Sequence, residues 1–147
     1  MTNSPTETTL QFKRTLSATR EKVFRAWTEP AEMKKWFAPS DEFSVPFAEV
    51  DLRVGGQYRI GMKPPEGNEV YIATGTYREV HPPDKLVFTW GWEGPNWYET
   101  RVTIELRAVG NSTELVLTHE LFPSVEERDK HNHGWMGCVG RLEKLLS

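Results

Sequence analysis

Residues 124–146 read SVEERDKHNHGWMGCVGRLEKLL, and this stretch decides the fold. Ser124 and Glu127 form a capping-box pattern, which predicts that a helix begins here. At 100° per residue, one face of that helix carries mostly apolar side chains: His131, Trp135, Cys138, Val139, Leu142, Leu145 and Leu146. Such a helix is stable mainly through packing of its apolar face, so the preceding residues must supply the surface that it covers.

The histidines and the cysteine of this stretch are not expected to form a local metal site. His133 lies on the opposite helix face from His131, and Cys138 is roughly 10 Å from His131 along the axis. Zinc needs ligand atoms about 2.0–2.3 Å from one ion. Glu127 and His131 could share a metal only with ligands from elsewhere, and no HExxH or paired-cysteine pattern is present. On its apolar stripe, Cys138 is expected to behave as a small hydrophobic group. We therefore expect neither a metal nor another cofactor.

Three glycines, Gly134, Gly137 and Gly140, lie within the predicted helix. Each costs about 0.8–1 kcal/mol relative to alanine in a helix interior. The helical wheel places Gly137 and Gly140 away from the core-facing stripe. They either permit bending or the approach of a partner, or they are substitutions that the packed face tolerates, and the sequence leaves both interpretations open.

The residues before this helix predict a sheet. LQFKRTL (10–16) alternates as a half-buried strand, and two short helices follow, at TREKVFRAW (19–27) and AEMKKWF (31–37). From about residue 43 the hydrophobic period is two, and turns separate about six further strands. These are FSVPFAEVDLRV (43–54), QYRIGMK (57–63), VYIATGTYREV (70–80), KLVFTWGW (85–92), YETRVTIELRA (98–108) and TELVLTHELF (113–122).

The predicted fold class is α+β, with a curved antiparallel sheet of about seven strands around a long C-terminal helix. The two short helices after the first strand would close one end of this arrangement. We expect one domain at residues 9–147, preceded by a disordered N-terminal lead at residues 1–8.

Composition and charge exclude several classes of protein. The formal charge is −3 with no long basic run, so no nucleic-acid partner is expected. The start, MTNSPTETT, lacks the features of a signal peptide, and no stretch approaches the roughly 18 apolar residues of a membrane span. The single cysteine excludes an internal disulfide and fits a reducing compartment, so we expect a cytoplasmic protein.

Aromatic residues make up 12% of the chain, with six tryptophans, which is many for a domain of this size. They either fill a core or line a cavity between the helix and the sheet. His119 and His131 also fall on predicted inward faces, where a histidine more often satisfies a backbone carbonyl than performs chemistry. If a cavity exists, its predicted ligand-binding residues are Tyr58, Tyr71, Trp90, Trp92, Trp97, His119, His131 and Trp135.

Several segments together resemble one known family. EKVFRAWTEPAEMKKWF (21–37), DLRVGGQYRI (51–60), GTYREVHPPDKLVFTW (75–90) and HGWMGCVGRLEKLL (133–146) occur in this order, with VTIELR (102–107) and TELVLTH (113–119) between the last two. Over about residues 9–147 the chain resembles single-domain bacterial members of the activator of heat-shock-protein-90 ATPase homologue family, within the START-like, birch-pollen-allergen-like (SRPBCC) superfamily. The resemblance implies a helix-grip fold with a hydrophobic cavity.

The resemblance leaves three functions open. The first, which we favour, is binding of a small hydrophobic or aromatic molecule, with His119, His131 and Arg14 as polar contacts. The second is a chaperone-related interaction module in a stress response, for which Arg20, Lys22, Arg25, Lys34 and Lys35 form a basic cluster. The third is a cyclase or hydrolase that uses His119 or His131, aided by Glu120 or Tyr71. The oligomeric state, a homodimer included, does not follow from the sequence.

Overall fold

The computed structural model describes residues 8–147. Seven strands and three helices follow one another in the predicted order. They are β1 (Leu10–Leu16), α1 (Arg20–Thr28), α2 (Pro30–Met33), β2 (Ala48–Val50), β3 (Gln57–Met62), β4 (Tyr71–His81), β5 (Lys85–Trp92), β6 (Thr100–Val109), β7 (Ser112–Glu120) and α3 (Val125–Leu145).

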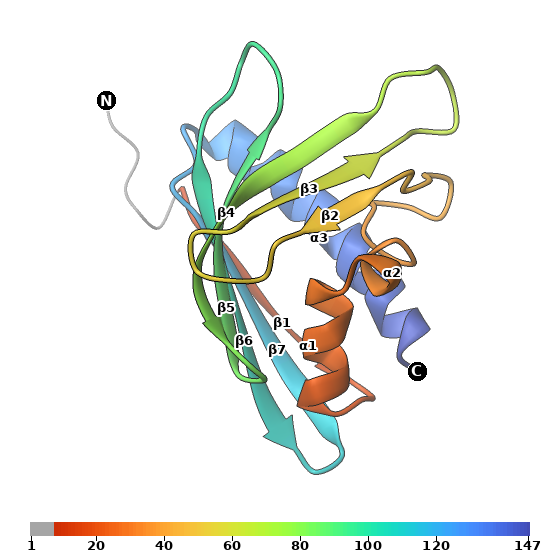
Figure 1. The fold of residues 1–147 in the computed structure, drawn as a ribbon, viewed down its shortest axis with the longest axis vertical. Coiled ribbons are helices and arrows are strands. Elements are labelled where there is room, and N and C mark those ends of the chain that lie inside the picture. Colours follow the sequence, from red (N-terminus) through yellow and green to blue (C-terminus); the bar gives the residue numbers. More distant parts are fainter. Residues whose placement is uncertain (1–7) are drawn as a thin grey trace.

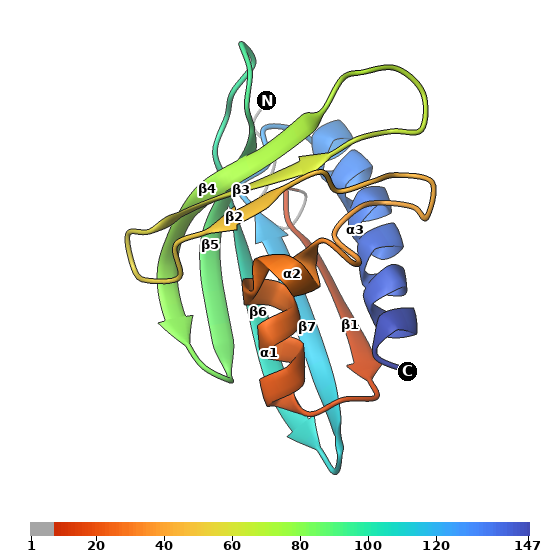
Figure 2. The same cartoon turned by 45° about the vertical axis from the view of Figure 1, so that its right-hand side comes forward.

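All seven strands form one curved antiparallel sheet in the order β1-β7-β6-β5-β4-β3-β2. The three helices lie on its concave side, with α3 running along the sheet and α1 and α2 gathered at one end (Figure 1). The rotated view in Figure 2 shows α1 and α2 in front of β6 and β7, with α3 to one side of them, next to β1. This is the helix-grip architecture that the sequence predicts.

The C-terminal helix begins where its capping pattern predicts. Ser124 is the N-cap, and its Oγ accepts a hydrogen bond of 3.1 Å from the backbone N–H of Glu127. The side chains that α3 buries come from the predicted apolar face and include Trp135, Val139 and Leu142. Burial of this face against the sheet fixes the helix, because an isolated helix with three glycines would be marginal in water.

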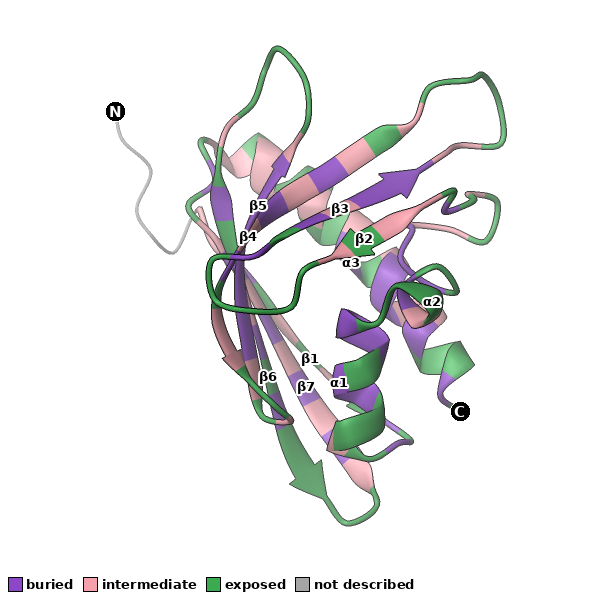
Figure 3. Ribbon diagram, viewed as in Figure 1, coloured by how far each residue is buried: buried purple, intermediate pink, exposed green. Residues whose placement is uncertain are grey.

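Alternating burial along the strands also matches the sequence pattern. In β6, every second residue from Thr100 to Leu106 is buried, and β7 alternates in the same way (Figure 3). Strand β5 departs from the pattern, since Val87 and Thr89 on its other face are buried as well. The concave face of the sheet is therefore the core face, and β5 crosses it at its centre.

Two predicted elements are shorter than expected. The strand predicted at residues 43–54 is reduced to Ala48–Val50, with only an isolated bridge between Ser44 and Lys63 before it. Pro46 has no N–H to donate and interrupts the ladder. The second helix ends at Met33, and the two buried aromatics that follow it, Trp36 and Phe37, pack from a turn.

The lead predicted at residues 1–8 lies outside the described residues except for Thr8, whose carbonyl accepts a hydrogen bond from the N–H of Phe122. Within residues 8–147, no helix is long and apolar enough to cross a membrane.

Candidate ligand-binding site

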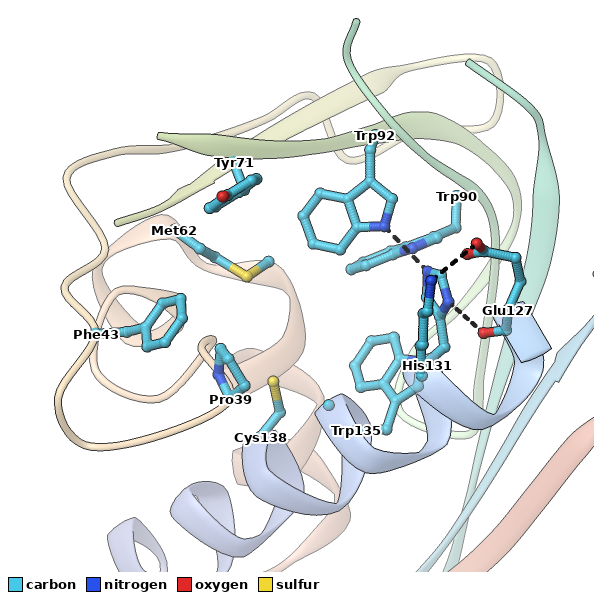
Figure 4. A pocket seen from close by; sticks show the side chains of 12 residues that line it. Pro39, Phe43, Met62, Tyr71, Trp90, Trp92, Glu127, His131, Trp135 and Cys138 are labelled. Atoms are coloured by element: carbon cyan, nitrogen blue, oxygen red, sulfur yellow. Dashed lines mark hydrogen bonds and ion pairs between the residues drawn. The ribbon is translucent and has the colours of Figure 1, made fainter. Parts of the chain in front are cut away.

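A pocket of about 340 Å³ lies between the first half of α3, the sheet and the segment that joins α2 to β2 (Figure 4). Helix α3 forms one wall, and strands β3, β4 and β5 form the facing wall. The lining residues are Pro39, Phe43, Met62, Tyr71, Trp90, Trp92, Glu127, Lys130, His131, Gly134, Trp135 and Cys138. Most of these side chains are apolar or aromatic, and the charged ones all belong to the first turns of α3.

Trp90 is the centre of the aromatic wall. Its ring centroid lies 5.0 Å from that of Trp135 and 5.4 Å from that of Trp92. Phe37 stacks near it at 6.1 Å. Edge-on and tilted packing of this kind is favourable between aromatic rings, and it closes the floor of the pocket against the core.

His131 is held in its neutral form by its hydrogen bonds. Its Nε2 accepts from Trp92 Nε1–H at 3.0 Å, because an indole nitrogen can only donate. Its Nδ1–H therefore donates to the backbone carbonyl of Glu127 at 2.8 Å. Burial is the main cause that lowers the pKa of His131. Both ring nitrogens are thus engaged within the protein.

His119 lies behind the pocket and is fully buried. Its Nδ1 accepts from Trp135 Nε1–H at 3.0 Å, so its Nε2–H donates to Thr100 Oγ1 at 2.6 Å. The Thr100 hydroxyl in turn donates to the carbonyl of Trp90 at 2.9 Å. Burial, followed by the neighbouring His131, lowers the pKa of His119 well below its ordinary value. This histidine joins α3 to β6 and β7 and does not reach the pocket.

The polar end of the pocket is formed by Glu127 and Lys130. Glu127 Oε2 accepts a hydrogen bond of 2.8 Å from the hydroxyl of Tyr98, and Glu127 Oε1 lies 3.6 Å from Lys130 Nζ. The hydrogen bond from Tyr98 is the main cause that lowers the pKa of Glu127. The carboxylate is therefore ionised at neutral pH, and this end of the pocket carries one negative and one positive charge.

The segment between α2 and β2 is fixed to α3 by two contacts. A Cβ placed on Gly137 would lie 2.0 Å from the carbonyl oxygen of Pro39, so only glycine allows this approach. One turn further on, Arg141 Nε donates to Asp41 Oδ1 at 3.0 Å and its Nη1 donates to the carbonyl of Trp36 at 3.2 Å. Gly137 thus allows the segment between α2 and β2 to lie close against α3.

Five of the eight predicted lining residues reach the pocket: Tyr71, Trp90, Trp92, His131 and Trp135. The other three lie elsewhere. Tyr58 is buried deeper, with its hydroxyl on the carbonyl of Thr89 at 2.6 Å, and His119 lies behind the wall. Trp97 is 45% exposed and covers Gly91, where a Cβ would lie 2.3 Å from its ring.

Sequence reasoning missed seven lining residues, which lie on α3, on β3 and in the segment between α2 and β2. On α3, Glu127, Gly134 and Cys138 lie on one stripe with His131, and this spacing of three and four was a usable signal. On the facing wall, Met62 lies at the end of β3. Pro39 and Phe43 belong to the irregular segment between α2 and β2, which periodicity cannot orient. Arg14, predicted as a polar contact, donates instead to Met136 Sδ at 3.0 Å and does not line the pocket.

The site offers little to a metal or a nucleophilic mechanism. Over the part of the chain that the structure describes, no group of three or more His, Cys, Asp or Glu side chains could hold a metal ion. Burial raises the pKa of the Cys138 thiol to about 12, so this side chain is a neutral thiol at the pocket wall.

Comparison with known proteins identifies the family. The sequence profile described as "Activator of Hsp90 ATPase homolog 1-like protein" matches residues 17–147. The chain belongs to this family. No curated protein sequence matches it significantly.

Three solved structures illustrate the likeness of this Hsp90-activator-like chain to its relatives. A protein from Nitrosomonas europaea is 30% identical with a TM-score of 0.81, and the alignment covers 99% of this chain and 97% of that one. A protein from Chromobacterium violaceum is 25% identical with a TM-score of 0.83, covering 95% and 96%. An HSP90 activator from Plasmodium falciparum is 26% identical with a TM-score of 0.71, covering 95% and 96%.

Proposed function

We propose that this protein binds a small, mainly apolar molecule in the pocket between α3 and the sheet. The observation that carries the proposal is a cleft of about 340 Å³, walled mainly by aromatic and other apolar side chains, between α3 and the sheet. Small-molecule sites in proteins are typically clefts of this size, lined mostly by apolar and aromatic side chains with a few polar groups.

The expected affinity is modest. A ligand that buries about 300 Å² of apolar surface gains roughly 7 kcal/mol at 25 cal/mol/Å², before the entropic cost of association is subtracted. Micromolar binding is therefore expected only if the walls are already formed. The contacts of Arg141 and Gly137 with the α2–β2 segment favour preformed walls.

The enzymatic alternative, in which His119 or His131 acts on the substrate, has less support in the geometry. A general base needs a free nitrogen or oxygen facing the substrate. Both ring nitrogens of His119 and of His131 already have hydrogen-bond partners, and burial lowers the pKa of each. Glu120, considered as a helper, pairs with Arg101 at 2.9 Å.

The proposal is tested by filling the pocket from the helix side. A Cβ on Gly134 meets nothing within 4 Å, and this residue lines the pocket, so Gly134→Leu places a side chain in the open space. Gly140 lies in the same helix, also meets nothing within 4 Å and does not line the pocket, so Gly140→Leu is a matched control. Both changes should stabilise α3 by up to about 1 kcal/mol.

Binding is measured by titration with N-phenyl-1-naphthylamine, a neutral dye whose fluorescence rises in apolar surroundings. We expect saturable binding to the wild type and to Gly140→Leu, and at least tenfold weaker binding to Gly134→Leu. A wild type that does not bind this dye or related aromatic compounds, or a Gly134→Leu variant that binds as well as the wild type, would disprove the proposal.

A second candidate function is contact with a chaperone, favoured by the family to which the chain belongs and by the likeness to an HSP90 activator. The predicted basic cluster lies on and after α1, and Lys22 and Lys34 are exposed there. The test is the ATPase rate of a heat-shock protein 90 with and without this protein. Stimulation that is lost in a Lys22→Glu, Lys34→Glu double variant would support this function, and an unchanged rate would count against it.

A further inference from the structure

The two charges at the polar end of the pocket are only loosely paired. Glu127 Oε1 and Lys130 Nζ are 3.6 Å apart, which is longer than a normal hydrogen bond between such groups. Their side chains are 32% and 63% exposed, so both can reach a bound molecule. Glu126 lies 3.8 Å from the same ammonium group but does not line the pocket.

Outside this end, most side-chain N–H and O–H groups of the pocket wall already have partners within the protein, and the weakest of these bonds joins the Tyr71 hydroxyl to Glu69 Oε2 at 3.4 Å. The indole N–H groups of Trp92 and Trp135 donate to His131 and His119, and the N–H of His131 donates to a backbone carbonyl. Trp90 Nε1 has no partner among the described residues, but the atom is buried beneath the wall. A polar group that a ligand carries inward would therefore stay unpaired, at about 1–3 kcal/mol. Glu127 and Lys130 therefore offer a polar group of the ligand its strongest partners, because both are charged and both line the pocket.

The charge of the ligand's polar group follows from the charges of Glu127 and Lys130. A carboxylate would be attracted by Lys130 but repelled by Glu127, and an ammonium group would experience the reverse. A hydroxyl can donate to the Glu127 carboxylate and accept from the Lys130 ammonium at the same time. Being neutral, it also avoids the cost of moving a charge into an apolar site.

Resting on the proposed function, we propose that the pocket selects a neutral apolar molecule with one terminal hydroxyl, such as a phenol or an aromatic alcohol. About 340 Å³ corresponds to the liquid volume of roughly eleven waters, which suits a body of about two fused rings. Glu127 and Lys130 are then the residues that determine the polar specificity of the site.

The test uses four molecules that share one ring system: naphthalene, 2-naphthol, 2-naphthoate and the 2-naphthylmethylammonium ion. Dissociation constants are measured near pH 7.5 by displacement of N-phenyl-1-naphthylamine. We expect 2-naphthol to bind about tenfold more tightly than naphthalene, because hydrogen bonds to charged groups are stronger than those between neutral groups. Both ionic molecules should bind more weakly than 2-naphthol.

Three variants identify the residues responsible. In Glu127→Gln and in Lys130→Met, the affinity ratio of 2-naphthol to naphthalene should fall to about threefold or less. Glu126→Gln removes the neighbouring carboxylate and should leave this ratio unchanged. The affinity of each variant for naphthalene shows whether its pocket is intact. A small loss of stability weakens the binding of both molecules alike, so it leaves the affinity ratio of 2-naphthol to naphthalene unchanged.

The outcomes separate this inference from the proposal on which it rests. If naphthalene and the dye bind but 2-naphthol binds no more tightly, or if the acid or the ammonium ion binds most tightly, the hydroxyl inference is overturned and ligand binding stands. The same holds if the ratio is unchanged in both pocket variants. If neither naphthalene nor the dye binds to the wild type, both proposals fail.

Discussion

At the scale of single residues, two hydrogen bonds between a tryptophan and a histidine connect helix α3 with the sheet. Trp92 on β5 donates to His131 on α3, and Trp135 on α3 donates to His119 on β7. Since an indole nitrogen has no lone pair to offer, each imidazole must accept and must stay neutral. The two imidazole rings lie 5.4 Å apart, so protonation of one further disfavours protonation of the other.

The neutral histidines predict that the protein loses stability in mild acid. The folded-state pKa of His119 and of His131 is lowered, mainly by burial, so below pH 6.5 the unfolded chain binds more protons than the folded one. The free energy of unfolding should contain the whole contribution of the two neutral histidines above about pH 7. It should fall below pH 6.5 by up to about 1.4 kcal/mol per pH unit for each histidine, until the folded-state pKa is reached.

Urea unfolding at pH 7.5 and at pH 5.0 measures this effect. His119→Gln should show a smaller loss between the two pH values than the wild type. The exposed His133 provides the control, and His133→Gln should lose as much stability as the wild type. Equal losses in all three proteins would show that His119 does not cause the acid sensitivity.

The glycines of α3 predict opposite effects for the same substitution. Gly137→Ala would force a Cβ to within 2.0 Å of the Pro39 carbonyl oxygen, which is a backbone atom that cannot turn aside. We expect this variant to lose about 1–3 kcal/mol of unfolding free energy. Gly140→Ala meets nothing within 4 Å and should gain about 0.8–1 kcal/mol. Chemical denaturation compares the two variants, and a Gly137→Ala protein as stable as Gly140→Ala would contradict the contact.

At this scale, periodicity predicts the face of a residue but not its depth. Trp90 and Tyr58 both lie on the concave face, yet only Trp90 reaches the pocket, because the concave surface continues from the pocket into the solid core. Trp97 lies in the turn after β5, where no period applies, and its ring covers Gly91. Gly134 was noted as a helix-weakening residue, but its open space becomes visible only with the facing wall in place.

At the scale of elements, the segment between α2 and β2 is the least predictable part of the site. Its Phe43, Val45 and Phe47 alternate as in a strand, but Pro46 interrupts the ladder, and within residues 8–147 the sheet pairs β2 with β3 alone. The position of the segment therefore depends on a few backbone hydrogen bonds with β3 and the residue after it, and on its contacts with α3. Such contacts between distant residues carry no local signal, which explains why the strand was predicted too long.

Arg141 is expected to keep this wall of the pocket in place. Arg141→Met removes the bonds to Asp41 and to the Trp36 carbonyl, so the wall should open more often. We expect binding of N-phenyl-1-naphthylamine to weaken about three- to tenfold, and amide hydrogen exchange at residues 38–43 to accelerate.

The control for Arg141→Met is Arg107→Met. Arg107 is 74% exposed and lies 3.5 Å from Glu114 on the β6–β7 hairpin, and an exposed pair of this kind contributes about 0–1 kcal/mol. This variant should leave both measurements unchanged. If exchange at residues 38–43 is as slow in Arg141→Met as in the control, other contacts hold the wall.

At the scale of the whole molecule, the element order and the curved antiparallel sheet followed from the sequence, because short turns between alternating strands favour antiparallel neighbours. The capping box at Ser124 likewise placed the start of α3. The pairing of β1 with β7 joins strands far apart in the sequence and was not predicted. The sequence did not predict whether the helix covers a pocket or a solid interior. The pocket depends on two distances. The indole–imidazole bonds set the distance from α3 to the sheet, and Gly137 and Arg141 set the distance from α3 to the segment between α2 and β2.

Binding of a ligand in the pocket should raise the stability of the whole domain. A molecule that binds only the folded chain stabilises it by about 2.7 kcal/mol when present at a hundred times its dissociation constant. For a domain of 147 residues, this corresponds to a rise in Tm of roughly 5–10 °C. N-phenyl-1-naphthylamine should raise the Tm of the wild type by this amount. Gly134→Leu should start from a higher Tm without ligand and show almost no further rise. A dye that binds exposed apolar surface would stabilise both proteins alike or favour unfolding, so the difference between them reports occupation of the pocket itself.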